Sequence, residues 1–337
     1  MNSAKSNRFT GYKLPNGKEL KNRVVVPPMA SGTADPNGFV TPETLGHYEN
    51  LAKSGAALVM VEYTYVDLSG RSEDKQLGIQ SDRHIVGLTQ VAKRIHAAGA
   101  LAGLQITHAG GKTSVDLTGG VLWAPSNVPV PVKDREMGTP TPMSYEEITQ
   151  WKSAFLQASH RAVSAGFDIL EFHSAHGYGL NQWLSPLTNH RTDEYGGSLE
   201  NRCRLLLEII SEVRAAHSEL ILAVRMPGQD FLQGGLTIQD TQWVAGALER
   251  KGVDIIDVSS GIGGWRRPRD RDGEGYLVKE AQLIQSVVSV PVIGVGGIRT
   301  ASFIDRSVEQ GVFSLAAVGR AILEAPLHWK EEQMTQY

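Results

Sequence analysis

Cysteine is almost absent from this chain, because Cys203 is the single one among 337 residues. The chain can therefore form no internal disulfide, no zinc site made of four cysteines and no iron–sulfur cluster held by several of its own thiolates. Cys203 lies in a helical pattern, and we expect it to be a buried or partly buried thiol with a structural role.

Long apolar runs and an excess of charge of one sign are also missing. Lys and Arg number 33 and Asp and Glu 36, so the net charge is −3 and no basic field would attract nucleic acid. No run of about 18 apolar residues is present, and the first residues lack the apolar core of a signal peptide. We therefore expect a cytoplasmic protein with neither a nucleic-acid nor a membrane partner.

Short apolar or β-branched segments recur along the chain, and amphipathic stretches separate them. The segments that predict strands are Val24–Val26, Leu58–Glu62, Leu101–Ile106, Ile169–Phe172, Ile221–Met226, Ile255–Ser259, Val292–Val295 and Leu315–Val318. The stretches that predict helices are Pro42–Lys53, Asp82–Ala98, Ser144–Ala165, Ser198–Ala216, Ile238–Lys251, Tyr276–Val288, Thr300–Gln310 and one after Gly319.

Capping residues and glycines mark the helix ends. Thr41 before Pro42 and Ser144 before Glu147 are typical N-caps, and Ser198 precedes a third helix. A glycine then follows five of the helical stretches, where a left-handed residue lets the chain reverse onto the next strand; these are Gly55, Gly99, Gly166, Gly252 and Gly311.

This alternation of buried strands and helices predicts an α/β fold, a (β/α)₈ TIM barrel. No linker or low-complexity segment divides residues 1–337, so we expect a single domain. A doubly wound open sheet is the alternative, but the glycine-rich fingerprint typical of it is missing after the first strand.

One connection is much longer than the others. About forty residues rich in Gly, Pro and Thr separate Ile106 from Ser144, and loops of this length in a compact domain are commonly lids or binding surfaces. The loop follows the third strand, so we expect a lid over the barrel mouth. A structural extension or an oligomer contact is the alternative.

The carboxyl ends of barrel strands form the active site in this fold. The fourth strand is followed by His173, His176 and Tyr178, which carry protons and hydrogen bonds; a helical turn there would place both imidazoles on one side. The other strand ends contribute Pro28, Met29, Ala30, Tyr63, Gln105, His108, Arg225, Ser259, Gly296, Gly297, Gly319 and Arg320.

The strand ends indicate a flat, phosphorylated cofactor. Glycine-rich turns after the last two strands, beside Arg320, occupy the customary phosphate position of the barrel, although tight turn geometry alone is the alternative. Gln105 and Arg225 suit a flavin pyrimidine ring, which becomes anionic on reduction. For Arg225 the alternative is an ion pair inside the barrel with a carboxylate such as Glu171.

The segment from Ile169 to Arg202 resembles the signature of the old yellow enzyme family, which are flavin-dependent ene-reductases. The elements H-x-A-H-G-Y, L-S-P-x-x-N-x-R and D-x-Y-G-G-S-x-x-N-R follow one another in order. Residues Lys21–Met29, Gly103–Gln105 with His108–Gly110, and Val318–Arg320 also look like their counterparts, so the resemblance covers nearly the whole chain.

The resemblance implies FMN in a TIM barrel and NADPH or NADH as the electron donor. It assigns FMN binding to Pro28, Met29, Ala30, the Tyr63 backbone, Gln105, Arg225, Gly296, Gly297, Gly319 and Arg320. His173 and His176 would bind the carbonyl of an activated alkene such as an enone, maleimide or nitroalkene, and Tyr178 would protonate it. The resemblance leaves open whether the chain forms a homo-oligomer.

The chain departs from the family pattern at three places. Ala30 stands where many members carry a Thr or Cys that touches the flavin, and Ser31 and Gly32 lack a tyrosine that the similar thermophilic-like subgroup places near the substrate. We expect Tyr63 or Tyr65 to compensate. The tail that sends an arginine into a neighbouring subunit's site in that subgroup has no counterpart after Trp329.

Three other functions stay open from the residues. A metal-dependent barrel hydrolase would use His173 and His176 as ligands, with His108 as a further ligand. A flavin barrel acting on tRNA would need a basic surface or an RNA-binding domain. A non-catalytic ligand-binding barrel would keep the cavity without the chemistry.

Overall fold

The predicted barrel is confirmed. The computed structural model describes residues 7–133, 135–264, 268 and 270–335. A closed parallel barrel is formed, in chain order, by β3 (Val24–Val26), β4 (Leu58–Tyr65), β5 (Leu101–Thr107), β8 (Ile169–His173), β9 (Ile221–Pro227), β10 (Ile255–Ser259), β11 (Val292–Gly294) and β12 (Leu315–Ala317). β12 pairs with β3 to close it.

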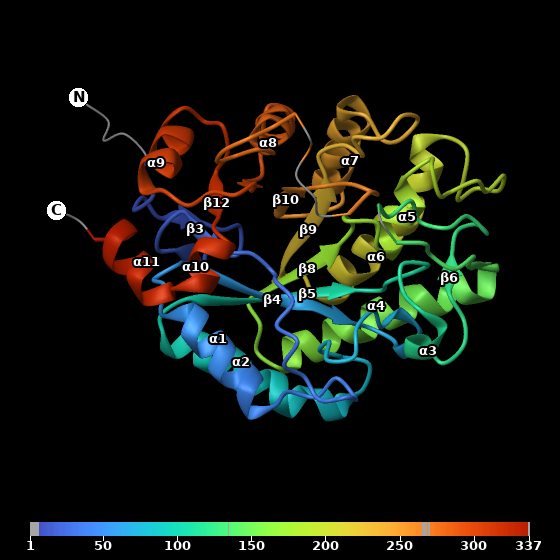
Figure 1. The fold of residues 1–337 in the computed structure, drawn as a ribbon, viewed down its shortest axis with the longest axis horizontal. Helices are drawn as coiled ribbons and strands as arrows, with labels where there is room; N and C mark the ends of the chain where they lie inside the picture. The colour runs from blue at the N-terminus through green and yellow to red at the C-terminus, as the bar shows by residue number, and fades with distance from the viewer. Residues whose placement is uncertain (1–6, 134, 265–267, 269, 336–337) are drawn as a thin grey trace.

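Helices surround the strands, with α1 and α2 on one side and α7, α8 and α9 on the other (Figure 1). Two expected stretches are shorter than predicted: residues 82–84 form a 3₁₀ turn before α2, and the stretch from Tyr276 to Val288 is helical only in α8. The outer helices are α1 (Pro42–Ala52), α2 (Ile85–Ala97), α4 (Tyr145–Ser164), α6 (Leu199–Ala216), α7 (Ile238–Arg250), α8 (Val278–Gln285), α9 (Ala301–Glu309), α10 (Arg320–Glu324) and α11 (Pro326–Gln333).

The predicted caps and glycine stops are present. Thr41, Ser144 and Ser198 each accept a hydrogen bond from a backbone N–H in the first turn of their helix. The glycines at 55, 99, 166, 252 and 311 all have φ between 66° and 86°, the left-handed region that glycine adopts without steric cost. At these five places local sequence therefore marks where a helix ends and the next strand approaches.

The cap of α4 provides a stability test. In its capping box the Ser144 side chain binds an N–H of the first turn, while Glu147 accepts from the Ser144 backbone N–H. We expect Ser144→Ala to lower the free energy of unfolding by about 1 kcal/mol. Urea denaturation measures this, with Ser164→Ala near the exposed end of the same helix as the control; equal losses in both variants would contradict the capping role.

The barrel interior changes from apolar to polar along each strand. Alternate residues of a strand point to the same face, so Ile169 at the start of β8 shares the inner face with Glu171 and His173. On β9 and β10 the corresponding polar residues are Arg225 and Asp257. The apolar end forms a separate buried cluster with its own packing, and the polar end opens at the carboxyl ends of the strands.

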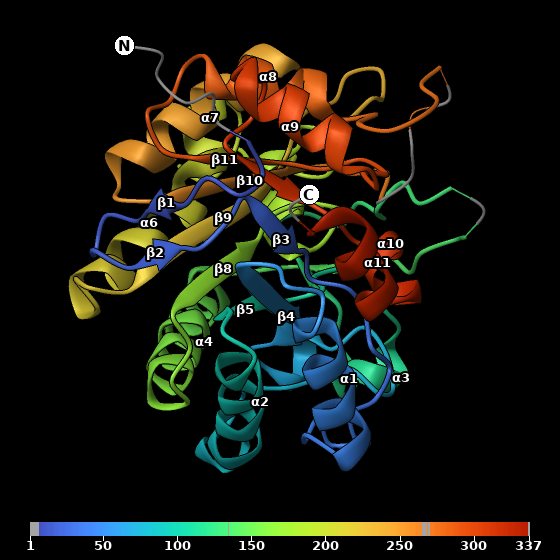
Figure 2. The ribbon, with the colours of Figure 1, turned by 90° about the vertical axis from the view of Figure 1, so that its left-hand side faces the viewer.

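A hairpin that the sequence did not predict closes the other end of the barrel. β1 (Tyr12–Lys13) and β2 (Glu19–Leu20) are antiparallel. Leu14 and Leu20 are 1% and 0% exposed and join the apolar cluster inside the barrel. Figure 2 shows this hairpin beside β9 and β3. Among the described residues, the hairpin therefore covers the end of the barrel opposite the mouth.

The long connection after β5 lies at the mouth, as predicted. It contains the short helix α3 (Val115–Thr118) and a parallel pair of short strands, β6 (Trp123–Ala124) and β7 (Thr141–Pro142). Arg191, from the family-like motif, donates to the carbonyls of Met143 and Pro125 at 2.6 and 3.2 Å. Arg191 therefore holds the second half of the loop at Pro125 and at Met143, and this part of the motif is structural.

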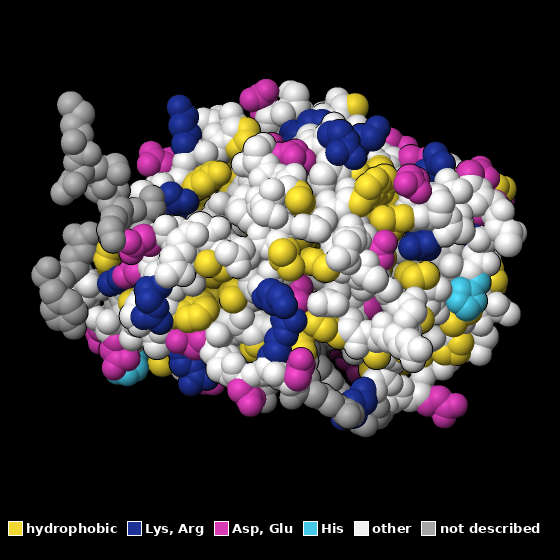
Figure 3. All heavy atoms as spheres, turned by 90° about the horizontal axis from the view of Figure 1, so that it is seen from above, with side chains coloured by type: hydrophobic (Ala, Val, Ile, Leu, Met, Phe, Trp, Pro, Cys, Tyr) yellow, Lys and Arg dark blue, Asp and Glu magenta, His cyan; other side chains and the backbone are white. Residues whose placement is uncertain are grey.

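No helix in the described part of the chain is both long enough and apolar enough to cross a membrane. On the face seen in Figure 3, basic and acidic side chains are interspersed rather than gathered by sign.

Candidate active site

His173, His176 and Tyr178 meet at the end of β8. The rings of His173 and His176 lie 5.0 Å apart edge to face, and the ring of Tyr178 lies 5.0 Å from His173. The expected helical turn between the two histidines is wrong. His176 has a φ of 60°, so a left-handed residue brings the rings together, and α5 (Gly179–Leu184) begins only after Tyr178.

The two imidazoles are neutral hydrogen-bonding groups. His176 Nε2 lies 2.6 Å from Ser259 Oγ, whereas His173 Nδ1 is buried and has no hydrogen-bond partner within the described residues. Burial and the positive charge of Arg225 hold the pKa of both histidines well below the usual range. The pair can therefore bind an electronegative oxygen without carrying a charge of its own at neutral pH.

Tyr178 keeps its proton at neutral pH. Burial raises its pKa to about 12, and the negative charge of Glu73 acts in the same direction. Its ring also lies 5.5 Å from that of Tyr63, with an angle of 31° between the planes. The phenol therefore carries a proton at the edge of the cavity.

Lys112 is a site residue that the sequence did not predict. Its Nζ donates to the His176 carbonyl at 2.5 Å and lies 4.6 Å from the centre of the Tyr178 ring. Burial, together with the charge of Arg135, lowers the pKa of Lys112 to about 8. The signal was available, since Lys112 stands six residues after Ile106, the end of the predicted third strand, at the start of the predicted lid.

Below these residues lies a buried layer of four polar side chains. Gln105 Nε2 donates to Glu171 Oε1 at 2.7 Å, and Arg225 Nε lies 3.1 Å from Asp257 Oδ2. The register explains the grouping, because Gln105 stands opposite Glu171 and Arg225 opposite Asp257 on neighbouring strands. The ion pair inside the barrel that was the alternative for Arg225 is present, with Asp257 rather than Glu171 as its carboxylate.

One guanidinium cannot neutralise both carboxylates. Burial raises the pKa of Glu171 to about 8, with a further contribution from the charge of Asp257. Burial also raises the pKa of Asp257, although Arg225 opposes the shift. Glu171 Oε2 and Asp257 Oδ1 have no hydrogen-bond partner in the described part of the chain, and Arg225 Nε lacks hydrogen-bond geometry despite its ion pair. Of the four side chains, Gln105 and Arg225 also line the cavity above this layer, where a polar ring system could contact them.

The buried acid predicts a pH-dependent stability. The pKa of Glu171 is about 8 in the folded chain, which keeps the proton up to that pH, whereas the unfolded chain loses it near the ordinary glutamate pKa of 4.5. The free energy of unfolding therefore falls as pH rises through this window, by at most about 1.4 kcal/mol per pH unit. Because Gln does not titrate, we expect Glu171→Gln to become progressively more stable than the unaltered protein between pH 5 and pH 8.

Urea denaturation of both flavin-free proteins at pH 5, 6.5 and 8 measures the difference. Asp254→Asn is the control, because Asp254 pairs with Arg214 outside the barrel mouth. Parallel pH profiles for Glu171→Gln and the unaltered protein would contradict a proton held on Glu171.

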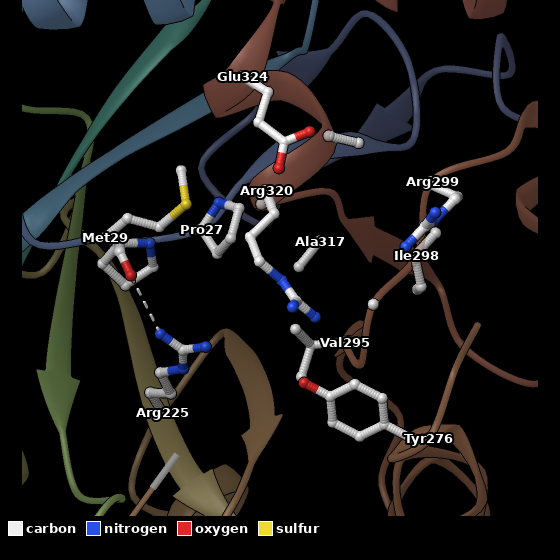
Figure 4. A pocket seen from close by; sticks show the side chains of 14 residues that line it. Pro27, Met29, Arg225, Tyr276, Val295, Ile298, Arg299, Ala317, Arg320 and Glu324 are labelled. Carbon is white, nitrogen blue, oxygen red and sulfur yellow. Dashed lines mark hydrogen bonds between the residues drawn. The ribbon is translucent and has the colours of Figure 1, made fainter. Parts of the chain in front are cut away.

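The predicted phosphate position borders a cavity of about 330 Å³. Gly297, Gly319 and Arg320 line it, together with Arg225 (Figure 4). The N–H groups of Arg299 and Thr300, just before α9, are already bound by the Glu274 carboxylate, at 2.5 and 2.7 Å. The turns at Gly297 and Gly319 are left to receive a phosphate.

Gly296 stabilises this turn through the hydrogen bonds of its backbone carbonyl. Its φ is 126°, and its carbonyl accepts from the N–H groups of Gly275 and Tyr276 at 2.6 and 3.1 Å. A Cβ on Gly296 would come within 2.8 Å of the Tyr276 backbone nitrogen. Gly296 is therefore required by the approach of another backbone segment, and a direct phosphate contact from it stays a prediction.

A second cavity, of about 490 Å³, lies above the polar layer and joins the first. Six residues line both cavities: Pro28, Met29, Arg225, Tyr276, Val295 and Arg320. Ala30, Tyr63, Gln105, His173, His176 and Tyr178 also line the second. The combined space has a polar floor at one end and cationic, glycine-rich walls at the other, which suits the ring system and phosphate of FMN.

The residues after β3 are arranged around a buried acid. Ser31, which follows the exposed Ala30, donates through both its N–H and its hydroxyl to Glu62, and burial raises the pKa of Glu62 to about 7. Tyr63 faces the site, whereas Tyr65 donates to the Asn37 carbonyl at 2.9 Å outside it. Of the two tyrosines expected to compensate, only Tyr63 is in position.

The backbone of Tyr63 is partly engaged. Its carbonyl accepts from Gln76 Nε2 at 2.6 Å, so this oxygen is not free for a cofactor. The expected contact between the Tyr63 backbone and the flavin stays a prediction, and the structure places the side chain in the cavity instead.

His108 does not belong to the site. It is 1% exposed, its ring lies 4.1 Å from that of Trp151, and its Nε2 lies 3.0 Å from Ser69 Oγ. Within residues 7–133, 135–264, 268 and 270–335, no group of three or more His, Cys, Asp or Glu could hold a metal ion. The hydrolase alternative therefore lacks the third ligand that the sequence offered.

Cys203 is buried as expected. It is 0% exposed within α6, and burial raises the pKa of its thiol to about 12.

Comparison with known proteins agrees with the geometry. The model of the NADH:flavin oxidoreductase / NADH oxidase family matches residues 9–333. The chain is 39% identical over 326 residues to an NADPH dehydrogenase of Halalkalibacterium halodurans, covering 96% of this chain and 93% of that protein. It is 37% identical over 308 residues to an NADPH dehydrogenase of Bacillus subtilis, covering 91% and 88%.

The fold has close structural relatives. The old yellow enzyme homologue from Zymomonas mobilis superposes with a TM-score of 0.82 at 24% identity, over 95% of this chain and 90% of that one. Three findings agree. The family model matches nearly the whole chain, two NADPH dehydrogenases are 39% and 37% identical to it, and the expected residues line the cavity. The chain belongs to the NADH:flavin oxidoreductase / NADH oxidase family, the old yellow enzymes, and is an oxidoreductase that uses FMN and NAD(P)H.

Proposed function

We propose that this protein reduces carbon–carbon double bonds conjugated to a carbonyl, imide or nitro group. The observation that carries the proposal is the convergence of two neutral imidazoles and a protonated phenol, His173, His176 and Tyr178, over one cavity. Two hydrogen-bond donors suit an oxygen that gains negative charge, and a phenol beside them suits delivery of one proton.

The chain's own residues bind and polarise the alkene. Bound FMN supplies the hydride, which it takes from NADPH or NADH. His173 and His176 hold the electron-withdrawing oxygen and stabilise the charge that develops on it when the β-carbon is reduced. Tyr178 then gives its Oη proton to the α-carbon, and its pKa of about 12 keeps that proton available throughout the neutral range.

The polar floor prepares the ring site. Arg225 carries a permanent charge, and its position beside Asp257 and the Pro28 carbonyl, 3.4 Å from its Nη1, fixes where that charge lies. A cation below the ring favours the reduced, anionic form of a flavin. Gln105 is oriented by its bond to Glu171 and presents its remaining amide atoms to the same space.

Anaerobic stopped-flow spectroscopy tests the proposal. The FMN-loaded protein is reduced with NADPH or NADH and then mixed with cyclohexenone, N-methylmaleimide or a nitroalkene. We expect loss and return of the flavin absorbance with both donors and at least one alkene, and a reduced alkene as product. Reduction by the nicotinamide without reoxidation by any alkene would overturn the substrate class, and absence of any turnover would favour a binding role.

A further inference from the structure

Three of the four polar atoms of His176 are engaged by the chain itself. Its N–H donates to the Ser260 carbonyl at 3.1 Å, and its carbonyl accepts from Lys112 Nζ at 2.5 Å. Its ring atom Nε2 lies 2.6 Å from Ser259 Oγ. No described residue forms a hydrogen bond with Nδ1, so Nδ1 is the ring nitrogen left for a ligand in the cavity that His176 lines.

The backbone holds Ser259 in place beside this ring. Ser259 is the last residue of β10, and its carbonyl accepts from the Gly228 N–H at 2.8 Å. The turn after β8 packs closely on the residues that follow β10, because a Cβ on Gly177 would lie 2.5 Å from the Ile262 carbonyl oxygen. Two backbone segments that are packed together therefore set the contact between the imidazole and the serine hydroxyl.

The tautomer of His176 decides whether it can donate to a substrate. Burial and the charge of Arg225 hold the pKa of His176 well below its usual range, so the ring carries a single proton at neutral pH. A neutral imidazole has one N–H donor and one acceptor nitrogen, and the hydrogen bond at one nitrogen selects the tautomer. With the proton on Nε2, the Nδ1 lone pair would face the substrate oxygen and repel it.

The surroundings of Ser259 favour the tautomer that can donate. Ser259 is 4% exposed, and His176 Nε2 is the one hydrogen-bond partner of its Oγ among the residues that the structure describes. If the hydroxyl accepted from Nε2, its own proton would find no acceptor in that part of the chain, which costs free energy. Donation to Nε2 satisfies the serine proton and requires that the ring proton lie on Nδ1.

We propose that Ser259 is a positioning residue that donates its hydroxyl proton to His176 Nε2 and thereby keeps the ring proton on Nδ1, toward the substrate oxygen. This inference rests on the proposed function, because an oxygen acceptor in the cavity is what needs a donor at Nδ1. His173 offers its other nitrogen: its Nδ1 is buried without a partner among the described residues, which leaves Nε2 for the ligand. The two imidazoles therefore serve one oxygen through different ring atoms.

NMR of the FMN-loaded protein with ¹⁵N-labelled histidine tests the tautomer directly. The resonances that disappear in His176→Asn identify this ring. Thr and Val at position 259 are a matched pair, because both are β-branched and they differ in one hydroxyl. We expect the proton on Nδ1 in the unaltered protein and in Ser259→Thr, and on Nε2 in a measurable fraction of Ser259→Val. A proton on Nε2 in the unaltered protein would overturn the proposal, since Ser259 would then be the acceptor.

The rate of alkene reduction is the second measurement. The protein is reduced with NADPH and mixed with cyclohexenone, and Ser259→Ala is included because it adds no bulk to the cavity. We expect Ser259→Val and Ser259→Ala to be reoxidised about tenfold more slowly than Ser259→Thr, as when one hydrogen bond is lost. Reoxidation by ferricyanide, which uses no donor from His176, should be equal in all three.

The two measurements separate the proposal from the function on which it rests. Cyclohexenone rates in Ser259→Ala and Ser259→Val that equal the rate of the unaltered protein would overturn the positioning role. If no alkene reoxidises the unaltered protein, the proposed function fails, whereas the ¹⁵N spectrum still decides which nitrogen of His176 carries the proton.

Discussion

Tyr178→Phe should slow alkene reduction about 10²- to 10⁴-fold, the range expected when a general acid is removed. The variant loses one hydroxyl and keeps the ring that packs 5.0 Å from His173 and under Lys112. Reduction of the flavin by NADPH does not use the phenolic proton, so its rate should change little. The substitution should therefore slow the reduction of the alkene and leave the reduction of the flavin by NADPH nearly unchanged.

Stopped-flow measurement of the two halves separately checks this prediction. Reoxidation by ferricyanide, which needs no proton, serves as the internal control for the integrity of the bound flavin. Tyr195→Phe is a matched variant, because the Tyr195 hydroxyl bonds to Glu208, on α6, at 2.9 Å. Equal slowing of both half-reactions by Tyr178→Phe would show that the phenol holds the flavin or the pocket in shape rather than donating a proton.

Local sequence was sufficient to predict the barrel and its strands. The strands are short apolar runs, and five of the eight barrel strands begin two to four residues after a left-handed glycine; both signals act over a few residues. The hairpin formed by β1 and β2 was missed because each of its strands is two residues long. Its stability comes from Leu14 and Leu20 packing inside the barrel, which depends on residues far away in the chain.

The site was predictable where the residues follow a strand directly and less so elsewhere. His173, Arg225 and Gln105 stand at inward positions of their strands, and the fold brings them together. The pairing of Arg225 with Asp257 depends on register, which the sequence alone does not specify. Lys112 reaches the site from a loop whose course is fixed by the β6–β7 pair and by Arg191.

The turn at His176 explains why the spacing of His173 and His176 led to the wrong prediction of a helical turn. Its i, i+3 relation to His173 fits a helix, but the chain adopts a φ of 60° at His176, which is followed by Gly177 at a φ of 76°. Histidine, asparagine and aspartate tolerate the left-handed region better than most residues. The backbone there is also held by the Gly177 N–H, which donates to Asn181 Oδ1 at 2.8 Å.

Loss of a histidine donor should have the second large effect. We expect His173→Leu, which keeps a similar volume but has no N–H, to slow alkene reduction about 10²- to 10³-fold, as when one donor of an oxyanion site is removed. His173→Asn restores an N–H donor and should lose much less. At His176 only Asn is a fair replacement, because a left-handed backbone would add strain to Leu or Ala.

The pattern across these variants distinguishes polarisation from packing. If the imidazoles act by donating hydrogen bonds, Asn should be better than Leu at position 173, and the double variant His173→Asn with His176→Asn should lose less than His173→Leu alone. Flavin content and the rate of reduction by NADPH, measured in each variant, should stay close to those of the unaltered protein. Equal losses for Leu and Asn at position 173 would show instead that ring shape holds the substrate, because Asn and Leu resemble each other in size and differ in their ability to donate.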